Sequence, residues 1–214
     1  MILHVNRRTV RTIPPTVTRV APAPSGTENV AMTTFIVLLR GVNVSASTRV
    51  PMAELRRIAT NAGGTGVTTL LNSGNVVLDA DDDADAAAAL AARVRLGLRE
   101  SFGREIDTVV VPAARLDAVI AANPFPAQAA DDPAHLVVTW YLEPPAPHRI
   151  AAFDPARHGP EQMRWHDGVS YTWYPVDIGH STLTPTVLAR ALGPGTARNW
   201  STVLKLAAAA RDRR

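Results

Sequence analysis

The first strongly apolar stretch of the chain is residues 34–39, in which every position after Thr34 is large and hydrophobic. Successive side chains of a strand point to opposite faces, so this run places apolar side chains on both faces, as at Phe35 and Ile36. A strand that is apolar on both sides is typical of the centre of a sheet that is covered on each face. Polar residues follow at once, beginning with Arg40. We therefore predict a central strand whose end presents polar groups.

The hydrophobic pattern after this strand indicates a split βαβ unit. The predicted elements are a strand at 34–39, a helix from Pro51 to Gly63, strands at 67–71 and 76–78, a helix ending near Phe102 and a strand at 106–111. This β-α-β-β-α-β order is that of the ferredoxin-like arrangement, an antiparallel sheet with two helices on one face.

The second half of the chain repeats the theme more loosely. It is expected to contain a helix at 112–120, a strand at 135–142, a short helix at 144–153, a hairpin of 162–166 and 169–174, and helices at 185–192 and 197–210. Asp167-Gly168 is a strong hairpin turn. The last helix should bury one face, formed by Trp200, Val203, Leu204, Ala207 and Ala208.

These elements predict an α+β fold of two ferredoxin-like halves with antiparallel sheets and a C-terminal helix. The expected boundaries are an N-terminal extension at 1–31, a first subdomain at 32–112 and a second at 113–214. The extension is rich in proline and has no helical period, so we expect it to be disordered. An alternative interpretation is that translation starts at Met32 and that the extension is a gene-start artefact.

Net charge narrows the choice of partners. The chain has 22 basic and 19 acidic residues, and its sequence pI is about 9.9. Four arginines and Glu28 lie in residues 1–31, which leaves 18 basic and 18 acidic residues in the remainder. A neutral body offers no broad electrostatic footprint for nucleic acid, so we do not expect a nucleic-acid partner.

Composition also limits the chemistry. The chain has no cysteine, which excludes disulfides and thiolate chemistry and fits a cytoplasmic protein. It has no apolar run of membrane-spanning length. The six histidines are scattered, and no phosphate-loop or dinucleotide motif occurs, so we expect no metal and no cofactor. His180-Ser181 could suggest a base and a nucleophile, but Ser181 or Thr184 is better interpreted as the cap of the next helix.

Polar residues recur where predicted strands and helices end. The candidate ligand-binding residues are Arg40, Asn43, Ser73, Asn75, Arg198, Asn199 and Lys205. Thr196 is a plausible N-cap, which would place Arg198 in the first turn of the last helix. A cation there opposes the helix dipole unless an anion binds at that end. The opposing interpretation is that these side chains serve only as caps, turns and internal ion pairs.

Several of these residues lie in segments that together resemble a known family. The segments are FIVLLRGVNV, VPMAEL, LLNSGNVVL, ANPF and GTARNWSTVLKL, which occur in the family's order from residue 34 to about 206. They are similar to the bacterial domain of unknown function (DUF) 1697 family. The resemblance implies two α+β halves of ferredoxin-like character and a cytoplasmic location, and it implies no established activity.

Three functions are compatible with the sequence. The first is the binding of a small anionic ligand in a cleft between the two halves. The second is a nucleic-acid-binding module, because RNA-recognition motifs share this fold. Aromatic residues such as Trp140 and Trp173 are predicted on strands of the second sheet, where bases could stack on them. The third is a structural or protein-interaction role. Whether a reaction is catalysed is left open.

The charge balance generates a testable prediction. Protein that starts at Met32 should not bind labelled DNA or RNA oligonucleotides appreciably at physiological salt, because it has no excess of positive charge. Fluorescence anisotropy at several salt concentrations measures this. Submicromolar affinity that weakens with salt would contradict the prediction.

Overall fold

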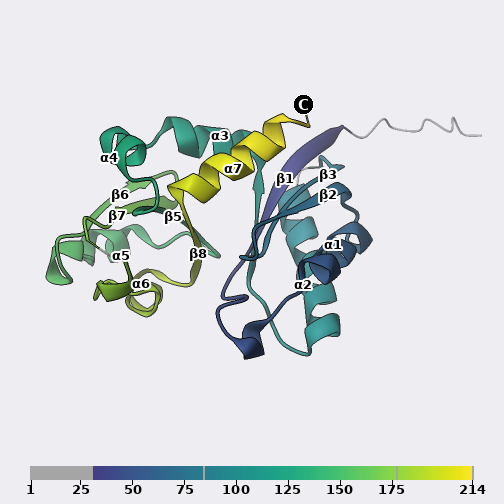
Figure 1. The fold of residues 1–214 in the computed structure, drawn as a ribbon, viewed down its shortest axis with the longest axis horizontal. Helices are drawn as coiled ribbons and strands as arrows, with labels where there is room; N and C mark the ends of the chain where they lie inside the picture. Colours follow the sequence, from purple (N-terminus) through teal and green to yellow (C-terminus); the bar gives the residue numbers. More distant parts are fainter. Residues whose placement is uncertain (1–30, 84, 177, 214) are drawn as a thin grey trace, which may run out of the picture.

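A computed structural model of the chain describes residues 31–83, 85–176 and 178–213, and it contains two α+β halves that lie side by side (Figure 1). Residues 1–30, most of the predicted extension, lie outside the described part. Each half contains one four-stranded antiparallel sheet. The predicted fold class, two similar ferredoxin-like halves and a C-terminal helix, is confirmed.

The first half contains the predicted β-α-β-β-α-β unit. Its elements are β1 (Met32–Leu39), α1 (Met52–Asn61), β2 (Thr65–Leu70), β3 (Asn75–Asp81), α2 (Ala86–Phe102) and β4 (Thr108–Pro112). The sheet has the order β2-β3-β1-β4. β1 is therefore a central strand, as its two apolar faces predict.

The second half repeats this order. Its elements are β5 (Leu136–Tyr141), α5 (Pro147–Ala152), β6 (Gln162–His166), β7 (Val169–Trp173), α6 (Pro185–Leu192) and β8 (Gly195–Asn199). The sheet order is β6-β7-β5-β8, which corresponds strand for strand to that of the first half. Two helices, α3 (Ala113–Ala121) and α4 (Pro126–Asp131), connect the halves, and α7 (Trp200–Arg211) follows β8.

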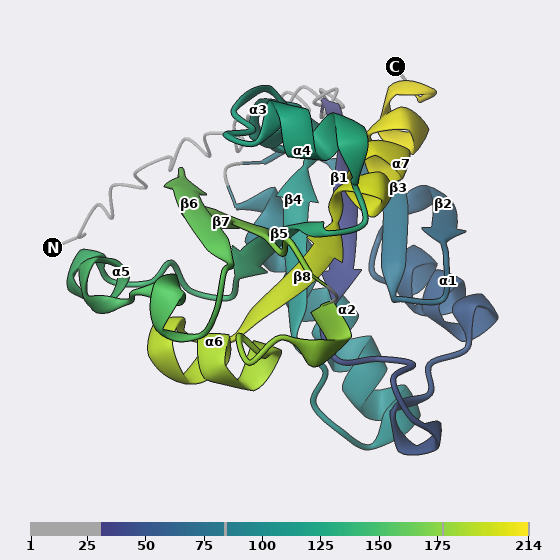
Figure 2. The ribbon, with the colours of Figure 1, turned by 60° about the vertical axis from the view of Figure 1, so that its left-hand side comes forward.

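One hydrophobic core is shared by both halves. It contains Ile36 and Leu38 of β1, Leu136 and Val138 of β5, and buried residues of α3 and α7. The side chains that alternate with them, such as Phe35, pack instead beneath α1 and α2. α7 contacts strands of both sheets as well as α3 (Figure 2). The inner faces of the two sheets are thus closed by helices that belong to neither βαββαβ unit.

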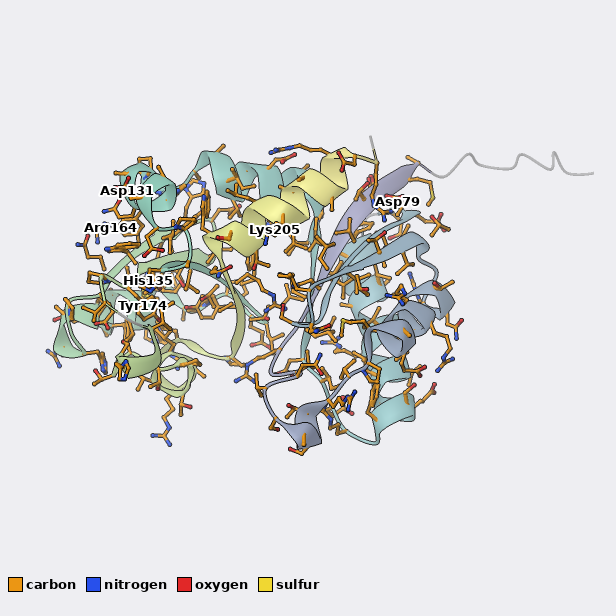
Figure 3. All side chains as sticks on the ribbon, in the orientation of Figure 1. Asp79, Asp131, His135, Arg164, Tyr174 and Lys205 are labelled. Carbon is orange, nitrogen blue, oxygen red and sulfur yellow. The ribbon has the colours of Figure 1, made fainter. Side chains whose placement is uncertain are left out.

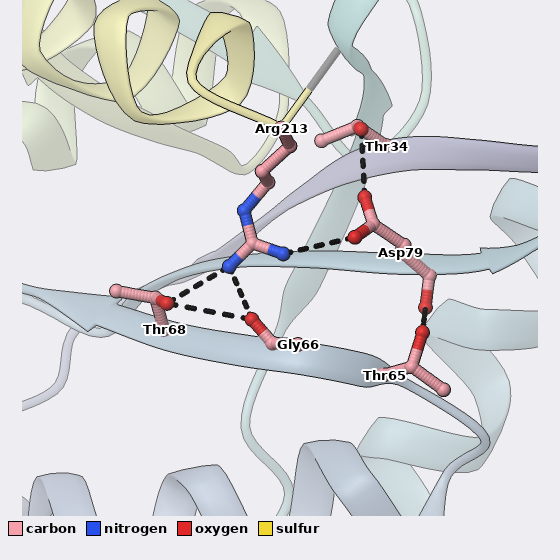
Figure 4. A network of polar contacts seen from close by, with 6 residues as sticks. All are labelled: Thr34, Thr65, Gly66, Thr68, Asp79 and Arg213. Atoms are coloured by element: carbon pink, nitrogen blue, oxygen red, sulfur yellow. Dashed lines mark hydrogen bonds and ion pairs between the residues drawn. The ribbon is translucent and has the colours of Figure 1, made fainter.

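The end of α7 is held to the first sheet by a polar network (Figure 4). Arg213 donates to Asp79 Oδ2 at 3.1 Å, to Thr68 Oγ1 at 2.8 Å and to the carbonyl oxygen of Gly66. Thr34 donates to the other oxygen of Asp79 at 2.7 Å. The segment that follows α7 is therefore tied by a side chain to β2 and β3, and α7 itself packs in the shared core.

The start of the last helix differs from the prediction. Residues 195–199 form a strand, β8, in which Arg198 is paired with Val138 and Thr196 with Trp140. α7 begins only at Trp200, and its N-cap is Asn199 and not Thr196. Thr196 and Asn199 both belong to residue types that suit an N-cap. Residues 195–199 pair with β5, so the helix begins only after the strand.

The buried face of α7 also differs in part. Trp200, Val203 and Ala207 are buried as predicted, whereas Leu204 is 43% exposed. Ala208 is exposed as well, and the buried face continues through Leu206 and Ala210. The stripe of Trp200, Val203 and Ala207 could be widened on one flank by Leu204 or on the other by Leu206. The helix packs into the shared core with the Leu206 flank.

Further differences concern the bounds of strands, such as β3, which extends to Asp81, and short helices. α5 is shorter than the predicted segment 144–153, and it begins at Pro147, a residue suited to the first helical position. The six-residue helix α4 was not predicted. Among the helices of the described residues, none combines the length and apolar character needed to cross a bilayer.

The shared core generates a prediction about Trp200. Trp200 is 5% exposed and leads the face of α7 that packs into this core. Replacing it with alanine should lower the free energy of unfolding by about 3–5 kcal/mol, because it leaves a large cavity. Urea denaturation measures this, with Leu204→Ala on the exposed side of α7 as the control, expected to cost below about 1 kcal/mol. Equal losses in the two variants would contradict the assignment.

Candidate functional site

Arg198 occupies the centre of the predicted site and is almost entirely buried. Its guanidinium donates five hydrogen bonds of 2.5–3.0 Å, to Asn75 Oδ1, to Thr196 Oγ1 and to the carbonyl oxygens of Leu39, Ser73 and Ala197. Within the described residues it has no carboxylate partner. Burial lowers the pKa of Arg198 to about 10, which leaves it charged at neutral pH.

Asn75 and Ser73 are positioned by the tight turn that precedes β3. Asn75 is fully buried and donates to the hydroxyl of Ser73 at 2.8 Å and to the carbonyl oxygen of Leu70 at 3.1 Å. Between them, Gly74 has φ +71°, and a Cβ there would lie 2.6 Å from Val42. Only glycine allows the turn to pack this closely. The structure thus brings Ser73, Asn75 and Arg198 together, and the guanidinium bonds oxygens of the first half.

Arg40 and Asn43 are engaged elsewhere. Arg40 forms an ion pair with Asp107 at 2.9 Å on the surface of the first half. Asn43, with φ +57°, exchanges two hydrogen bonds with the backbone of Val50 and donates to the carbonyl oxygen of Asn72 at 2.6 Å. Asn43 also borders an open hollow of about 590 Å³ beside Arg49 at the start of α1.

The last two candidates lie on or beside α7. Asn199 Oδ1 caps this helix by accepting from the backbone N–H of Thr202 at 3.0 Å and from its hydroxyl at 2.7 Å. Lys205 lies on the exposed side of α7 (Figure 3). Arg198 belongs to a strand, so the expectation that it lies in the first turn of the last helix was wrong. The seven side chains are therefore divided among several places, and most of their hydrogen-bonding groups are used inside the protein.

A groove of about 470 Å³ lies in the second half, and of the seven candidates only Asn199 lines it. Its floor is the outer face of the sheet, with Val137, Thr139 and Tyr141 from β5 and Gly195, Ala197 and Asn199 from β8. Its walls come from Tyr174, from the loop that follows it and from α6. The loop and helix residues are Ile178, Gly179, Ser181, Leu183, Thr184, Pro185, Leu188 and Ala189, and Gly193 lies at the end of α6.

The groove exists because the outer helices of the second half are short. In the first half the 17-residue helix α2 covers the sheet with fully buried side chains such as Leu90 and Val94. The corresponding helix α6 has eight residues and buries only Leu188 and Leu192. Small residues on the floor enlarge the space, and Ala197, in the middle of a strand, is solvent-exposed. The same topology is therefore filled in one half and hollow in the other.

The walls of the groove are mostly apolar, with a few oriented polar groups. Thr184 Oγ1 caps α6 by accepting from the N–H of Val187 at 3.2 Å. Ser181 donates to the carboxylate of Glu161 and accepts from the N–H of Leu183 at 3.0 Å. Of the two predicted candidates, Thr184 is thus the cap of α6. Ser181 has a carboxylate partner that the sequence did not indicate.

The two tyrosines of the groove remain neutral over the physiological pH range. Burial raises the pKa of Tyr141 to about 12, and burial is also the largest cause of the rise in the pKa of Tyr174 to about 12. The hydroxyl of Tyr141 is hydrogen-bonded to Ser170 at 3.0 Å, and that of Tyr174 donates to the carbonyl oxygen of Leu183 at 3.3 Å. Both residues line the groove, and their hydroxyls are hydrogen-bonded to protein partners.

Sequence reasoning missed the groove because it missed β8. If residues 195–199 are assigned as the last strand of a second β-α-β-β-α-β unit, Gly195, Ala197 and Asn199 fall on one face and Thr196 and Arg198 on the other. The internal repeat was the available signal. Within the described residues, no group of three or more histidine, aspartate or glutamate side chains could hold a metal ion.

Comparison with known proteins adds a family and a fold. A family model described as "Protein of unknown function (DUF1697)" matches residues 32–171. No curated protein matches the chain. Among solved structures, the conserved bacterial protein SP0830 from Streptococcus pneumoniae is similar, with a TM-score of 0.62 and 20% identity, over 85% of this chain and 99% of that chain. At this level of identity the likeness shows a shared fold.

The hydrogen bonds of Arg198 generate a prediction about stability. Arg198→Met should lower the free energy of unfolding by on the order of 4 kcal/mol, because the carbonyl oxygens of Leu39 and Ser73 and the side-chain oxygen of Asn75 each lose a hydrogen bond. Arg198→Lys should cost less, about 2 kcal/mol, since an ammonium keeps the charge but not the planar set of donors. Urea denaturation measures both.

Arg95→Met is a suitable control, because Arg95 is exposed on α2. It should change the free energy of unfolding by less than about 0.5 kcal/mol. If Arg198→Met is as mild as this control, Arg198 is not the link between the halves.

Proposed function

The chain belongs to the DUF1697 family of proteins of unknown function, and we propose that it binds a small, largely apolar molecule in the groove of its second half. The observation that carries this proposal is the exposure of Ala197 on the floor of a 470 Å³ groove. A mid-strand residue on the helix-covered face of a ferredoxin-like sheet is normally packed beneath a helix. Here that space is open, and its volume is within the usual range for small-molecule sites.

Apolar surface around the groove supports the same proposal. Ile178, which lines the groove, is 37% exposed, and Val176 in the same loop is 62% exposed. A bound apolar molecule would remove such surface from water, with a gain of about 25 cal/mol for each square ångström buried. Tyr141 on the floor and Tyr174 on the wall add aromatic surface. These features favour a ligand with an apolar body.

The groove is a poorer place for the anion expected from the sequence. None of the described residues that line it carries a charge. An anion moved from water into such a site loses hydration without gaining a cationic partner. Arg198 is the buried cation next to Ala197 and Asn199 in β8, but its side chain lies on the opposite face of the strand. Its guanidinium donates hydrogen bonds to other groups of the protein. We therefore propose a ligand other than a carboxylate or phosphate for this site.

The other two functions have less support. A nucleic-acid module would need an excess of basic residues, and the chain from residue 32 onward has none. A purely structural role leaves the open floor of the groove without a use. The absence of cysteine supports the proposal that the protein acts in the cytoplasm.

Filling the groove tests the proposal. Thermal unfolding is measured with and without a set of apolar fragments, each with a phenyl or indole ring. A fragment present at ten times its Kd should stabilise the protein by about 1.4 kcal/mol and raise the Tm by roughly 3–5 °C. Ala197→Leu should abolish the shift, because the added side chain occupies the floor, while the variant itself unfolds within a few degrees of wild type.

The matched control is Ala92→Leu, which adds the same atoms at an exposed position on α2 in the first half. This variant should keep the full ligand-induced shift. The proposal fails if no fragment raises the Tm of the wild-type protein, or if Ala197→Leu responds as Ala92→Leu does.

A further inference from the structure

We infer that the groove selects ligands that carry an ammonium group, which binds at the Ser181 end, because a buried carboxylate lies directly behind that residue. This inference rests on the proposed function and specifies the class of ligand. It reverses the sign of charge expected from the sequence. The carboxylate is that of Glu161, the residue before β6.

Glu161 is a buried acid with few partners. It is 8% exposed, and its Oε1 accepts a hydrogen bond from Ser181. Its Oε2 is buried and has no hydrogen-bond partner among the described residues, and no ion pair with Glu161 occurs there. Gly159 packs against this oxygen so closely that a Cβ would lie 2.5 Å from it. The protein therefore holds a carboxylate with much less compensation than such a group normally has.

The contrast with Arg198 shows how unusual this is. Both side chains are buried charges, but among the described residues Arg198 makes five hydrogen bonds and Glu161 makes one. An under-compensated charge in a region of low dielectric constant creates a strong local potential. The pKa of Tyr174, on the groove wall, is raised mainly by burial. The negative charge of Glu161 is the second cause of this rise. The charge of Glu161 therefore acts on a residue that lines the groove.

Ser181 lies between Glu161 and the groove, and its hydroxyl favours a ligand that donates a hydrogen bond. A serine hydroxyl has one hydrogen to donate and two lone pairs that accept. Ser181 donates its hydrogen to Glu161, and one lone pair accepts from the N–H of Leu183. The remaining lone pair is an acceptor on a residue that lines the groove. A ligand at this position must supply a hydrogen, and an ammonium group supplies hydrogens together with the positive charge that the potential favours.

Further along the groove, the protein offers hydrogen-bond donors and therefore favours acceptor groups of a ligand. The side-chain oxygens of Thr184 and Asn199 are occupied as helix caps. Their hydroxyl hydrogen and amide nitrogen are donors, and neither has an acceptor among the described residues. The groove therefore offers an acceptor at Ser181 and donors at Thr184 and Asn199. The ligand that fits is an apolar amine, preferably with an acceptor group at a second position.

Three compounds of nearly equal size test the charge preference: 2-phenylethylamine, 2-phenylethanol and phenylacetate. Isothermal titration calorimetry on the wild-type protein should give the tightest binding for the amine, weaker binding for the alcohol and the weakest for the carboxylate. The amine should exceed the carboxylate by at least about ten-fold. This order requires no variant, so it stands even if substitutions at the buried acid impair folding.

Two matched variants identify the source of the preference. Glu161→Gln should weaken binding of the amine by about ten-fold and change binding of the alcohol by less than about two-fold. Glu105→Gln removes the same charge from an exposed position in the first half and should leave all three affinities unchanged.

The outcomes separate the two proposals. If the three compounds bind equally well, or the carboxylate binds best, the inference is wrong while the groove remains a binding site. The inference is also wrong if Glu161→Gln folds and keeps the wild-type order. If none of the three binds and the apolar fragments give no thermal shift either, both proposals fall.

Discussion

The position of one buried cation, Arg198, constrains the whole arrangement of this protein. Its guanidinium lies between the halves and bonds the carbonyl oxygens of Leu39 and Ser73 and the side chain of Asn75, all in the first half. Thr196, two residues earlier on the same face of β8, also donates to the carbonyl oxygen of Leu39 at 3.0 Å. These groups are shielded from water, so each half completes the hydrogen bonding of the other. The last strand of the second half thereby fixes the end of the central strand of the first.

The alternation of β8 joins this constraint to the proposed function. Thr196 and Arg198 face the first half, so Gly195, Ala197 and Asn199 must face the outer side of the second sheet. In the first half the outer side is filled by α1 and α2, and its core contains residues from both helices and the sheet. The outer core of the second half is much smaller. The two halves thus provide an internal comparison, in which the same topology with shorter helices leaves room for a ligand.

The sequence predicted the framework better than the site, for identifiable reasons. The two apolar faces of β1 and the hairpin turn at Asp167-Gly168 are strong local signals, and the structure contains both elements. β8 carries no such signal, because Gly195-Thr-Ala-Arg-Asn199 contains one β-branched residue and two plausible caps. Ser73, Asn75 and Arg198 do meet, but the same residue types suit an anion site and an internal clamp. The difference depends on backbone carbonyls supplied by distant segments, which no local pattern reveals.

The most direct test of the hollow second half is a crystal structure of the protein soaked with iodobenzene. Small aromatic molecules enter apolar cavities of sufficient size, and iodine identifies its own position by anomalous scattering. An iodine peak is expected over Ala197, between β8 and α6, and no peak is expected between the first sheet and its helices α1 and α2. A peak beneath α1 and α2, or an empty groove over Ala197, would contradict this expectation.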